Sequence, residues 1–455
     1  MRVTDPALAH LARHLVSGGD SRLALDPKTG RNKYLCPPLG EPDLVSFSSC
    51  TATPISALGL HAAAEALAEL SIGRAARQRA ALEEQTLGVS LRLTQHFGVD
   101  DLAVALLAPS GTDATLILMG LLAAEQPGRP IVNILPGSAE TGSGVPLAAA
   151  GRHFADADAG KPVAGFPADC RVIPVALRHP DGRPRSMDVL QVDLAAVARH
   201  APGRPVIHAI DGSKTGLSLP LDLEARAEVV VDACQVRLSP ARLRAHLFRN
   251  RPVLITGSKF FGGPAFSGAI LFPRRRLDAI DLSRLPPGLL RYLPGQGPKA
   301  RFSANRGTVL RWIAALAEIQ QFASLPFDEA GKRIARIASL VRDRVTQLPS
   351  LVPVPMPDSE EAGCFGAGSI ISFGMRDLER PGRLLSMAAV RPIHRRLADG
   401  GYLVGQPVAI GEAYGALRIA IGARNLFEDR ILARLDGLFA ALERCIASPS
   451  TMAAE

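Results

Sequence analysis

Short apolar segments alternate with helical stretches along much of the chain, and this alternation constrains the fold more than any other sequence feature. Helical spacing occurs, for example, at 114–125, 189–200 and 239–248. The apolar runs have the length of strands and occupy 102–108, 130–135, 170–176, 205–210, 228–232, 252–256 and 268–271. Apolar strands that alternate with helices are typical of a mainly parallel sheet covered on both faces. The sequence therefore predicts an α/β fold.

The pattern changes after about residue 310. A long helical stretch at 310–348 precedes strand-like runs near 368–373 and 416–421, and a helical pattern at 428–445 follows. A chain of 455 residues commonly forms more than one domain. We expect a large α/β domain at 76–310 and a smaller C-terminal α+β domain at 311–455. Residues 1–75 are expected to pack near both domains.

Composition and charge exclude several classes of protein. The net charge is +9, but the Arg residues are scattered along the chain, and aromatic residues make up only 5%. Nucleic-acid binding needs clustered basic residues, and the sequence shows no such cluster. No apolar run is long enough to cross a bilayer. The N-terminus lacks the apolar region of a secretion signal. These features predict a cytoplasmic protein with no membrane or nucleic-acid partner.

The cysteine pattern predicts free thiols and no metal site. The chain has no CxxC or HExxH motif, and its six cysteines are widely spaced, at Cys36, Cys50, Cys170, Cys234, Cys364 and Cys445. Such spacing fits neither a zinc site nor a disulfide framework, and it indicates a reducing compartment.

Three segments carry residues suited to one chemistry. Ser110-Gly-Thr lies between a strand and a helix, where free N–H groups bind phosphate. Asp232 ends an apolar strand at the edge where α/β sheets bind ligands. Lys259, one of seven lysines, follows another strand between small residues and two Phe. Each has a structural alternative: Ser110 can cap a helix, Asp232 a turn, and Lys259 can extend towards solvent.

Taken together, the three segments predict a cofactor site. A phosphate cradle, a carboxylate and an isolated lysine amine are the parts that pyridoxal 5'-phosphate (PLP) needs. Its aldehyde condenses with a lysine amine, and a carboxylate keeps its pyridine nitrogen protonated.

The motifs also resemble those of a known family. The order Ser-Gly-Thr, Asp232-Ala-Cys-Gln and Thr256-Gly-Ser-Lys-Phe-Phe-Gly-Gly-Pro resembles fold-type I PLP-dependent enzymes, above all the class V aminotransferase and cysteine desulfurase branch. Asn305-Arg-Gly-Thr resembles that branch's Gly-Thr loop, and Leu417-Arg-Ile-Ala-Ile resembles its carboxylate-binding Arg segment. The resemblance spans about residues 100–430 and implies a fold-type I PLP transferase.

The resemblance implies a role for each matching residue. Lys259 would hold the cofactor covalently and act as proton shuttle, Asp232 would hold the pyridine nitrogen, and Arg418 would bind a substrate carboxylate. The N-terminal segment would line the active-site mouth, with Asn32 and Ser49 as substrate-binding candidates. The other expected cofactor-binding residues are Ser110, Gly111, Thr112, Thr141, Gln235, Thr256, Ser258 and, from the neighbouring chain, Thr308. A homodimer with the active site at the subunit interface follows.

Departures from the family pattern limit the reaction. Ser258 stands where the branch usually has His, and residues 138–144 contain no aromatic to stack on the cofactor ring, which leaves Glu140 or Thr141 there. The loop before Arg418 carries Gln406 where a desulfurase has Cys, and Cys364 lies before the strand, so sulfur abstraction is disfavoured.

The leading interpretation is an aminotransferase-like biosynthetic enzyme that forms an external aldimine between PLP and a small amino acid or related amine. The alternative is a PLP-dependent lyase or an elimination, replacement or carbon–carbon bond-forming enzyme. A PLP-binding regulator would need a DNA-binding domain that the N-terminal residues do not supply, and no GxGxxG supports an NAD-binding protein.

Overall fold

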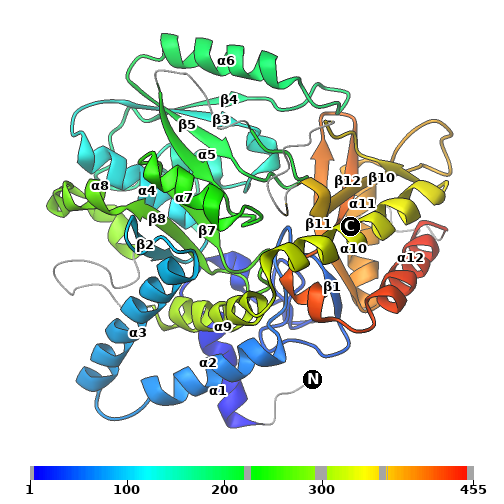
Figure 1. Ribbon diagram of the computed structural model, residues 1–455, viewed down its shortest axis with the longest axis horizontal. Coiled ribbons are helices and arrows are strands. Elements are labelled where there is room, and N and C mark those ends of the chain that lie inside the picture. The colour runs from blue at the N-terminus through cyan, green and yellow to red at the C-terminus, as the bar shows by residue number, and fades with distance from the viewer. Residues whose placement is uncertain (1–4, 220–226, 293–304, 358–364, 366, 448–455) are drawn as a thin grey trace.

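The computed structural model describes residues 5–219, 227–292, 305–357, 365 and 367–447, and contains two sheets surrounded by helices (Figure 1). Within these ranges, the helices are α1 (Pro6–Leu15), α2 (Ala57–Leu70), α3 (Ala75–His96), α4 (Gly111–Glu125), α5 (Val145–Ala149), α6 (Met187–His200), α7 (Pro240–Phe248), α8 (Arg274–Asp278), α9 (Arg306–Ala323), α10 (Phe327–Gln347), α11 (Met387–Asp399) and α12 (Ile431–Ala447). Cys364 lies outside the described residues.

The larger sheet has the strand order β2-β8-β7-β6-β5-β3-β4. Its strands are β2 (Ala103–Ala108), β3 (Ile131–Pro136), β4 (Arg171–Val175), β5 (Arg204–Ile210), β6 (Glu228–Asp232), β7 (Val253–Thr256) and β8 (Gly268–Pro273). Strands β4, β3, β5, β6 and β7 pair in parallel, whereas β8 is antiparallel to both β7 and β2. The expected mainly parallel α/β sheet is confirmed.

Helices cover both faces of this sheet, which explains why its strands are apolar without alternation. Along β6, Val229 and Val231 join the hydrophobic cluster that contains α3 and α7, while Val230 joins the cluster of α4 on the opposite face. Because a strand alternates its side chains between faces, two covered faces require a continuous apolar run. This packing directs the carboxyl ends of β6 and β7 towards the N-terminus of α4.

The smaller sheet has the order β1-β11-β12-β10-β9, and Figure 1 shows its orange strands beside α11 and α12. The strands are β1 (Val45–Phe47), β9 (Leu351–Pro353), β10 (Ile370–Met375), β11 (Tyr402–Ile410) and β12 (Tyr414–Ala420). Strand β1 comes from the N-terminal segment and pairs in parallel with β11, which places residues 48–53 beside both sheets.

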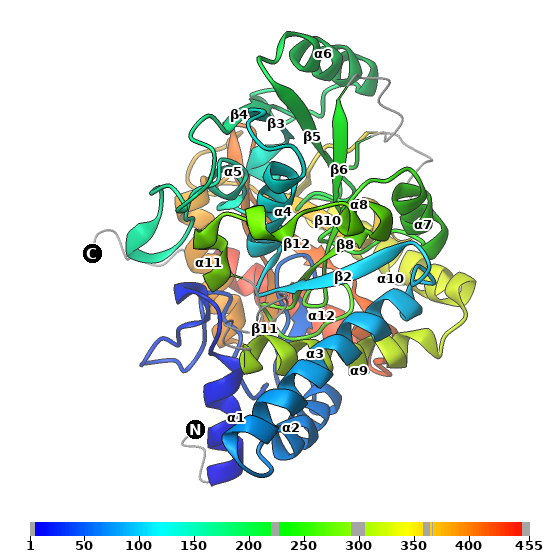
Figure 2. The ribbon, with the colours of Figure 1, turned by 90° about the vertical axis from the view of Figure 1, so that its left-hand side faces the viewer.

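Helix α9 packs against the three N-terminal helices. These are α1, α2 and α3, which lie together at the lower end of the molecule in Figure 2. The expected domain boundary at residue 310 falls inside α9. Pro326 separates α9 from α10 within the predicted helical stretch 310–348, and residues 71–74 separate α2 from α3. No helix in the described ranges is both long and apolar enough to span a membrane.

Candidate active site

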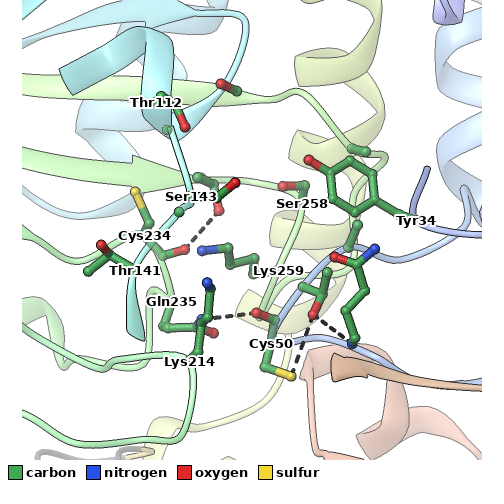
Figure 3. Close-up of a pocket in the computed structure, with 18 of the residues that line it drawn as sticks. Tyr34, Cys50, Thr112, Thr141, Ser143, Lys214, Cys234, Gln235, Ser258 and Lys259 are labelled. Carbon is green, nitrogen blue, oxygen red and sulfur yellow. Dashed lines mark hydrogen bonds between the residues drawn. The ribbon is translucent and has the colours of Figure 1, made fainter. Parts of the chain in front are cut away.

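A cavity of about 190 Å³ lies where the carboxyl ends of β6 and β7 meet the N-terminus of α4. Figure 3 shows that its walls come from the N-terminal segment, the larger sheet and the loop that carries Lys214. Ten of the residues expected from the sequence line it: Ser110, Gly111, Thr112, Thr141, Asp232, Gln235, Thr256, Ser258, Lys259 and Arg418. The other three, Thr308, Asn32 and Ser49, are not among its lining residues.

The N-terminus of α4 forms an anion-binding end of the cavity. Ser110 caps the helix, since its Oγ accepts from the N–H of Asp113 at 3.3 Å and its carbonyl accepts from the N–H of Ala114. The N–H groups of Gly111 and Thr112 have no acceptor inside the helix. A Cβ added at Gly111 would lie 2.8 Å from Cys234 Sγ, so glycine keeps the backbone close to the cavity.

Arg22, from the N-terminal segment, lies beside this helix terminus. Its Nη2 donates to Ser110 Oγ at 3.2 Å and to Asp20 at 2.6 Å, and its guanidinium lies over the Phe266 ring. The Asp20 hydrogen bond helps to raise the pKa of Arg22, against the effect of burial. Asp113 lies nearby, and burial raises its pKa to about 6. Arg22 could not be predicted from local sequence, because it reaches the site only through the fold.

The turn after β6 presents a carboxylate and an amide to the cavity. Asp232 Oδ1 accepts from the N–H of Cys234 at 3.1 Å, and no ion pair engages this carboxylate within the described ranges. Gln235 donates from Nε2 to the carbonyl of Cys50 at 3.0 Å, as Figure 3 shows, while its buried Oε1 has no partner. Val236 follows with a φ of 50°, a conformation that is unusual for a β-branched residue. This strained backbone fixes Gln235 against the cavity wall.

Lys259 follows β7 and points into the cavity, next to Ser258 (Figure 3). Its half-buried side chain forms no salt bridge in the part of the chain that the structure describes. Thr256 Oγ1 donates to the carbonyl of Cys234 at 2.8 Å, which joins the ends of β6 and β7. Lys259 and Asp232, which follow these two strands, therefore line the same cavity.

A second lysine, Lys214, also points into the cavity (Figure 3). Burial, followed by the charges of Arg418 and Lys259, lowers its pKa to about 8. Lys214 was not among the site residues expected from the sequence. The rarity of lysine in the chain was a signal that could have identified it.

Arg418, on β12, is buried without a carboxylate partner among the described residues. Its Nε and Nη2 donate to the carbonyl of Gln406, its Nη1 to the carbonyl of Lys214 at 3.0 Å, and its Nη2 to Thr51 Oγ1 at 3.0 Å. These bonds use four of the five N–H donors of the guanidinium. The fifth, on Nη1, remains for a ligand.

Glu140 lines the cavity, but a buried cation, Arg178, holds its carboxylate. Its carboxylate accepts from Arg178 Nε and from Ser213 Oγ, each at 2.6 Å, and also from Thr215 Oγ1. Thr141 also lines the cavity, with its hydroxyl donating to the carbonyl of Ser138. Glu140 is therefore a structural anchor for the turn at 213–216.

Thr308 is not placed as the resemblance implied. Its side chain is fully buried within its own chain, near the start of α9. The Thr308 hydroxyl accepts from Arg311 Nη2 at 3.1 Å and faces the carbonyl of Gly18 at 3.5 Å. In this arrangement the hydroxyl has no exposed surface to offer to a neighbouring subunit.

The two N-terminal candidates also have structural roles. Asn32 Oδ1 accepts from the N–H groups of Tyr34 and Cys36, which closes a turn. Ser49 donates to the carbonyl of Ala420 and accepts from Arg237, away from the cavity. Adjacent residues take their place, namely Lys33, Tyr34, Cys50, Thr51 and Ala52. The N-terminal segment thus contributes to the cavity wall, through side chains other than Asn32 and Ser49.

The cysteines that the structure describes are all free. Cys50 and Cys234 line the cavity, and both are buried. Burial raises the pKa of Cys234 well above its usual value, which disfavours a thiolate. Gln406 lies on β11 at the cavity wall, where the family comparison placed a desulfurase cysteine.

Solved structures share this architecture. The cysteine desulfurase CsdA from Escherichia coli has a TM-score of 0.58 at 15% identity, covering 90% of this chain and 96% of its own. The chain has the fold of fold-type I enzymes. A C-DES variant with glycine linked to its PLP cofactor scores 0.59 at 14% identity, covering 88% and 96% of the two chains. Oryza sativa TDC with PLP and tryptamine scores 0.55 at 14% identity, covering 90% and 83%. No protein-family model and no curated protein matches the chain.

Proposed function

We propose that the chain is a PLP-dependent enzyme that acts on an amino acid or a related amine. The observation that carries the proposal is the convergence of Lys259, Asp232 and the N-terminus of α4 on one cavity. The unpartnered Gln235 Oε1 and the close approach of the backbone at Gly111 are further features that PLP fits. Similarity in fold to PLP-containing structures supports the same cofactor.

Each of these groups matches one part of the cofactor. The N–H groups of Gly111 and Thr112, at the positive end of α4, would bind the phosphate. The free oxygen of Asp232 would keep the pyridine nitrogen protonated, and Gln235 would contact the ring hydroxyl. Ser258 and Thr141 line the cavity between these contacts. Lys259 Nζ is the covalent attachment point.

PLP, when bound, would supply an electron sink for the bonds at the substrate's α-carbon. Lys259 Nζ lines the cavity and would move a proton to or from that carbon. Arg418 orients the substrate through a carboxylate. The buried Phe266 at the cavity wall limits the access of water to the lysine amine.

Transamination is the reaction that we propose first, because Lys259 can supply the proton transfers. Strand β11 also carries Gln406 at the position where the family comparison placed a desulfurase cysteine. A lyase is the second candidate. It is favoured by the similarity in fold to CsdA, described as a cysteine desulfurase, and to TDC, whose structure holds tryptamine. The proposal includes a homodimer, which light scattering coupled to gel filtration tests.

The protein loaded with PLP should be incubated with a panel of amino acids, and the cofactor then identified by chromatography. Conversion to pyridoxamine 5'-phosphate together with a 2-oxo acid supports transamination. Release of ammonia, carbon dioxide or sulfide with PLP regenerated supports a lyase. A protein that takes up no PLP contradicts the proposal as a whole.

A further inference from the structure

The inference concerns Lys214, which neither the cofactor contacts nor the proton transfers proposed above require. Its half-buried side chain points into the cavity beside Lys259 (Figure 3). Among the described residues its Nζ has no hydrogen bond to a carboxylate and forms no ion pair. A cation in such a position lacks a counter-anion, and a ligand can supply one.

The turn that carries Lys214 is held rigidly. Ser213 and Thr215, on either side, both donate to the buried carboxylate of Glu140. The backbone of Lys214 is fixed at both ends, since its N–H donates to the carbonyl of Glu140 at 2.9 Å and its carbonyl accepts from Arg418. The lysine side chain is therefore preorganised to face the cavity.

The charged groups around Lys214 do not supply a free anion to pair with its ammonium. Arg418 from β12 and Lys259 from the end of β7 both lower its pKa, after the larger effect of burial, while Glu140 and Cys50 raise it. The charge of Glu140 is already shared with Arg178. The resulting pKa of about 8 makes Lys214 mostly a cation at neutral pH.

Arg418 cannot bind a carboxylate through two N–H donors in its present arrangement. Four of its donors are engaged with Gln406, Lys214 and Thr51, which leaves one on Nη1. Freeing a second donor would leave a buried carbonyl or hydroxyl without its partner. A carboxylate that enters the cavity therefore needs another donor close to Arg418.

We propose that the Lys214 ammonium and the free Nη1 N–H of Arg418 together form the receptor for the substrate's carboxylate. This inference rests on the proposed function and adds a residue that determines specificity for anionic substrates. Lys214 carries the charge that changes with pH, and Arg418 supplies a fixed charge and the orientation.

Acetate, which has a carboxylate and no amine, is a suitable probe for the PLP-loaded protein. Acetate binding is followed by titration of the cofactor absorbance, so the readout does not depend on turnover. Lys214→Met should raise the dissociation constant for acetate by about 10-fold or more, since one charge-assisted hydrogen bond is lost. The matched control is Lys28→Met, which removes an exposed lysine outside the cavity and should leave the constant unchanged.

A second variant keeps the inference testable if Lys214→Met does not fold. In the wild type, acetate binding should weaken as the pH rises through about 8, because Lys214 loses its proton. Lys214→Arg keeps a cation that stays charged throughout this pH range and should bind acetate without this loss. Equal dissociation constants for Lys214→Met and the wild type, or identical pH profiles for Lys214→Arg and the wild type, would overturn the inference. Failure of the wild type to take up PLP would instead overturn the proposed function.

Discussion

The buried ion pair of Glu140 and Arg178 allows a quantitative test of whether Glu140 stabilises the fold. Both side chains are 5% exposed, and Arg178 also donates to the carbonyls of Gly182 and Pro355. Glu140→Gln keeps the size of the side chain but leaves the Arg178 guanidinium buried without a counter-ion. Removing one partner of a buried pair costs about 3–5 kcal/mol. Urea denaturation followed by circular dichroism should show a loss of this size.

The control is Glu329→Gln, the same substitution in a surface pair. Glu329 contacts Arg333 at 2.8 Å, with both side chains more than 40% exposed. A helical surface pair of this type contributes about 0.3–0.5 kcal/mol. If Glu140→Gln were no more destabilising than Glu329→Gln but shifted the absorbance of bound PLP, Glu140 would contact the cofactor ring, as first expected from the sequence.

Three further changes test other parts of the site. Gly111→Ala should weaken PLP binding in a fluorescence titration, because the new Cβ would lie 2.8 Å from Cys234 Sγ; unchanged affinity would argue against this cradle. Between about pH 4 and 6 the folded state binds a proton at Asp113 that the unfolded state has lost, so this group lowers stability as pH rises. Asp113→Asn should remove that part of the pH dependence of unfolding. Arg418→Lys should weaken acetate binding and also lower the melting temperature, because each buried acceptor left unpaired costs about 1–3 kcal/mol of unfolding free energy. Weakened acetate binding at an unchanged melting temperature would contradict the bonds of Arg418 to Gln406 and Thr51.

The strands of the larger sheet could be predicted because their sequence pattern has a local cause. Residues 229–231 are all apolar since helices cover both faces, and the predicted limits of β6 agree with the structure. Strand β1 was not predicted. It has three residues and exists through its pairing with β11, more than 350 positions away in the chain.

In the candidate site, too, residues with a local sequence signal could be predicted, and residues placed by distant contacts could not. Asp232 and Lys259 directly follow apolar strands, so the topology of a parallel sheet brings them to one edge. Lys214, Tyr34 and Thr51 lie on loops whose paths depend on contacts made far along the chain. The ion pair of Glu140 could not be predicted, because its partner Arg178 lies 38 positions away and has no recognisable motif.

The covalent attachment of PLP to Lys259 is the central claim, and peptide mapping tests it most directly. The protein is incubated with PLP, reduced with borohydride, digested and analysed by mass spectrometry. The prediction is a single reduced adduct on Lys259, which disappears in Lys259→Ala. An adduct on Lys214 or Lys33, the two other lysines that line the cavity, or a protein that retains no PLP after reduction, would contradict it.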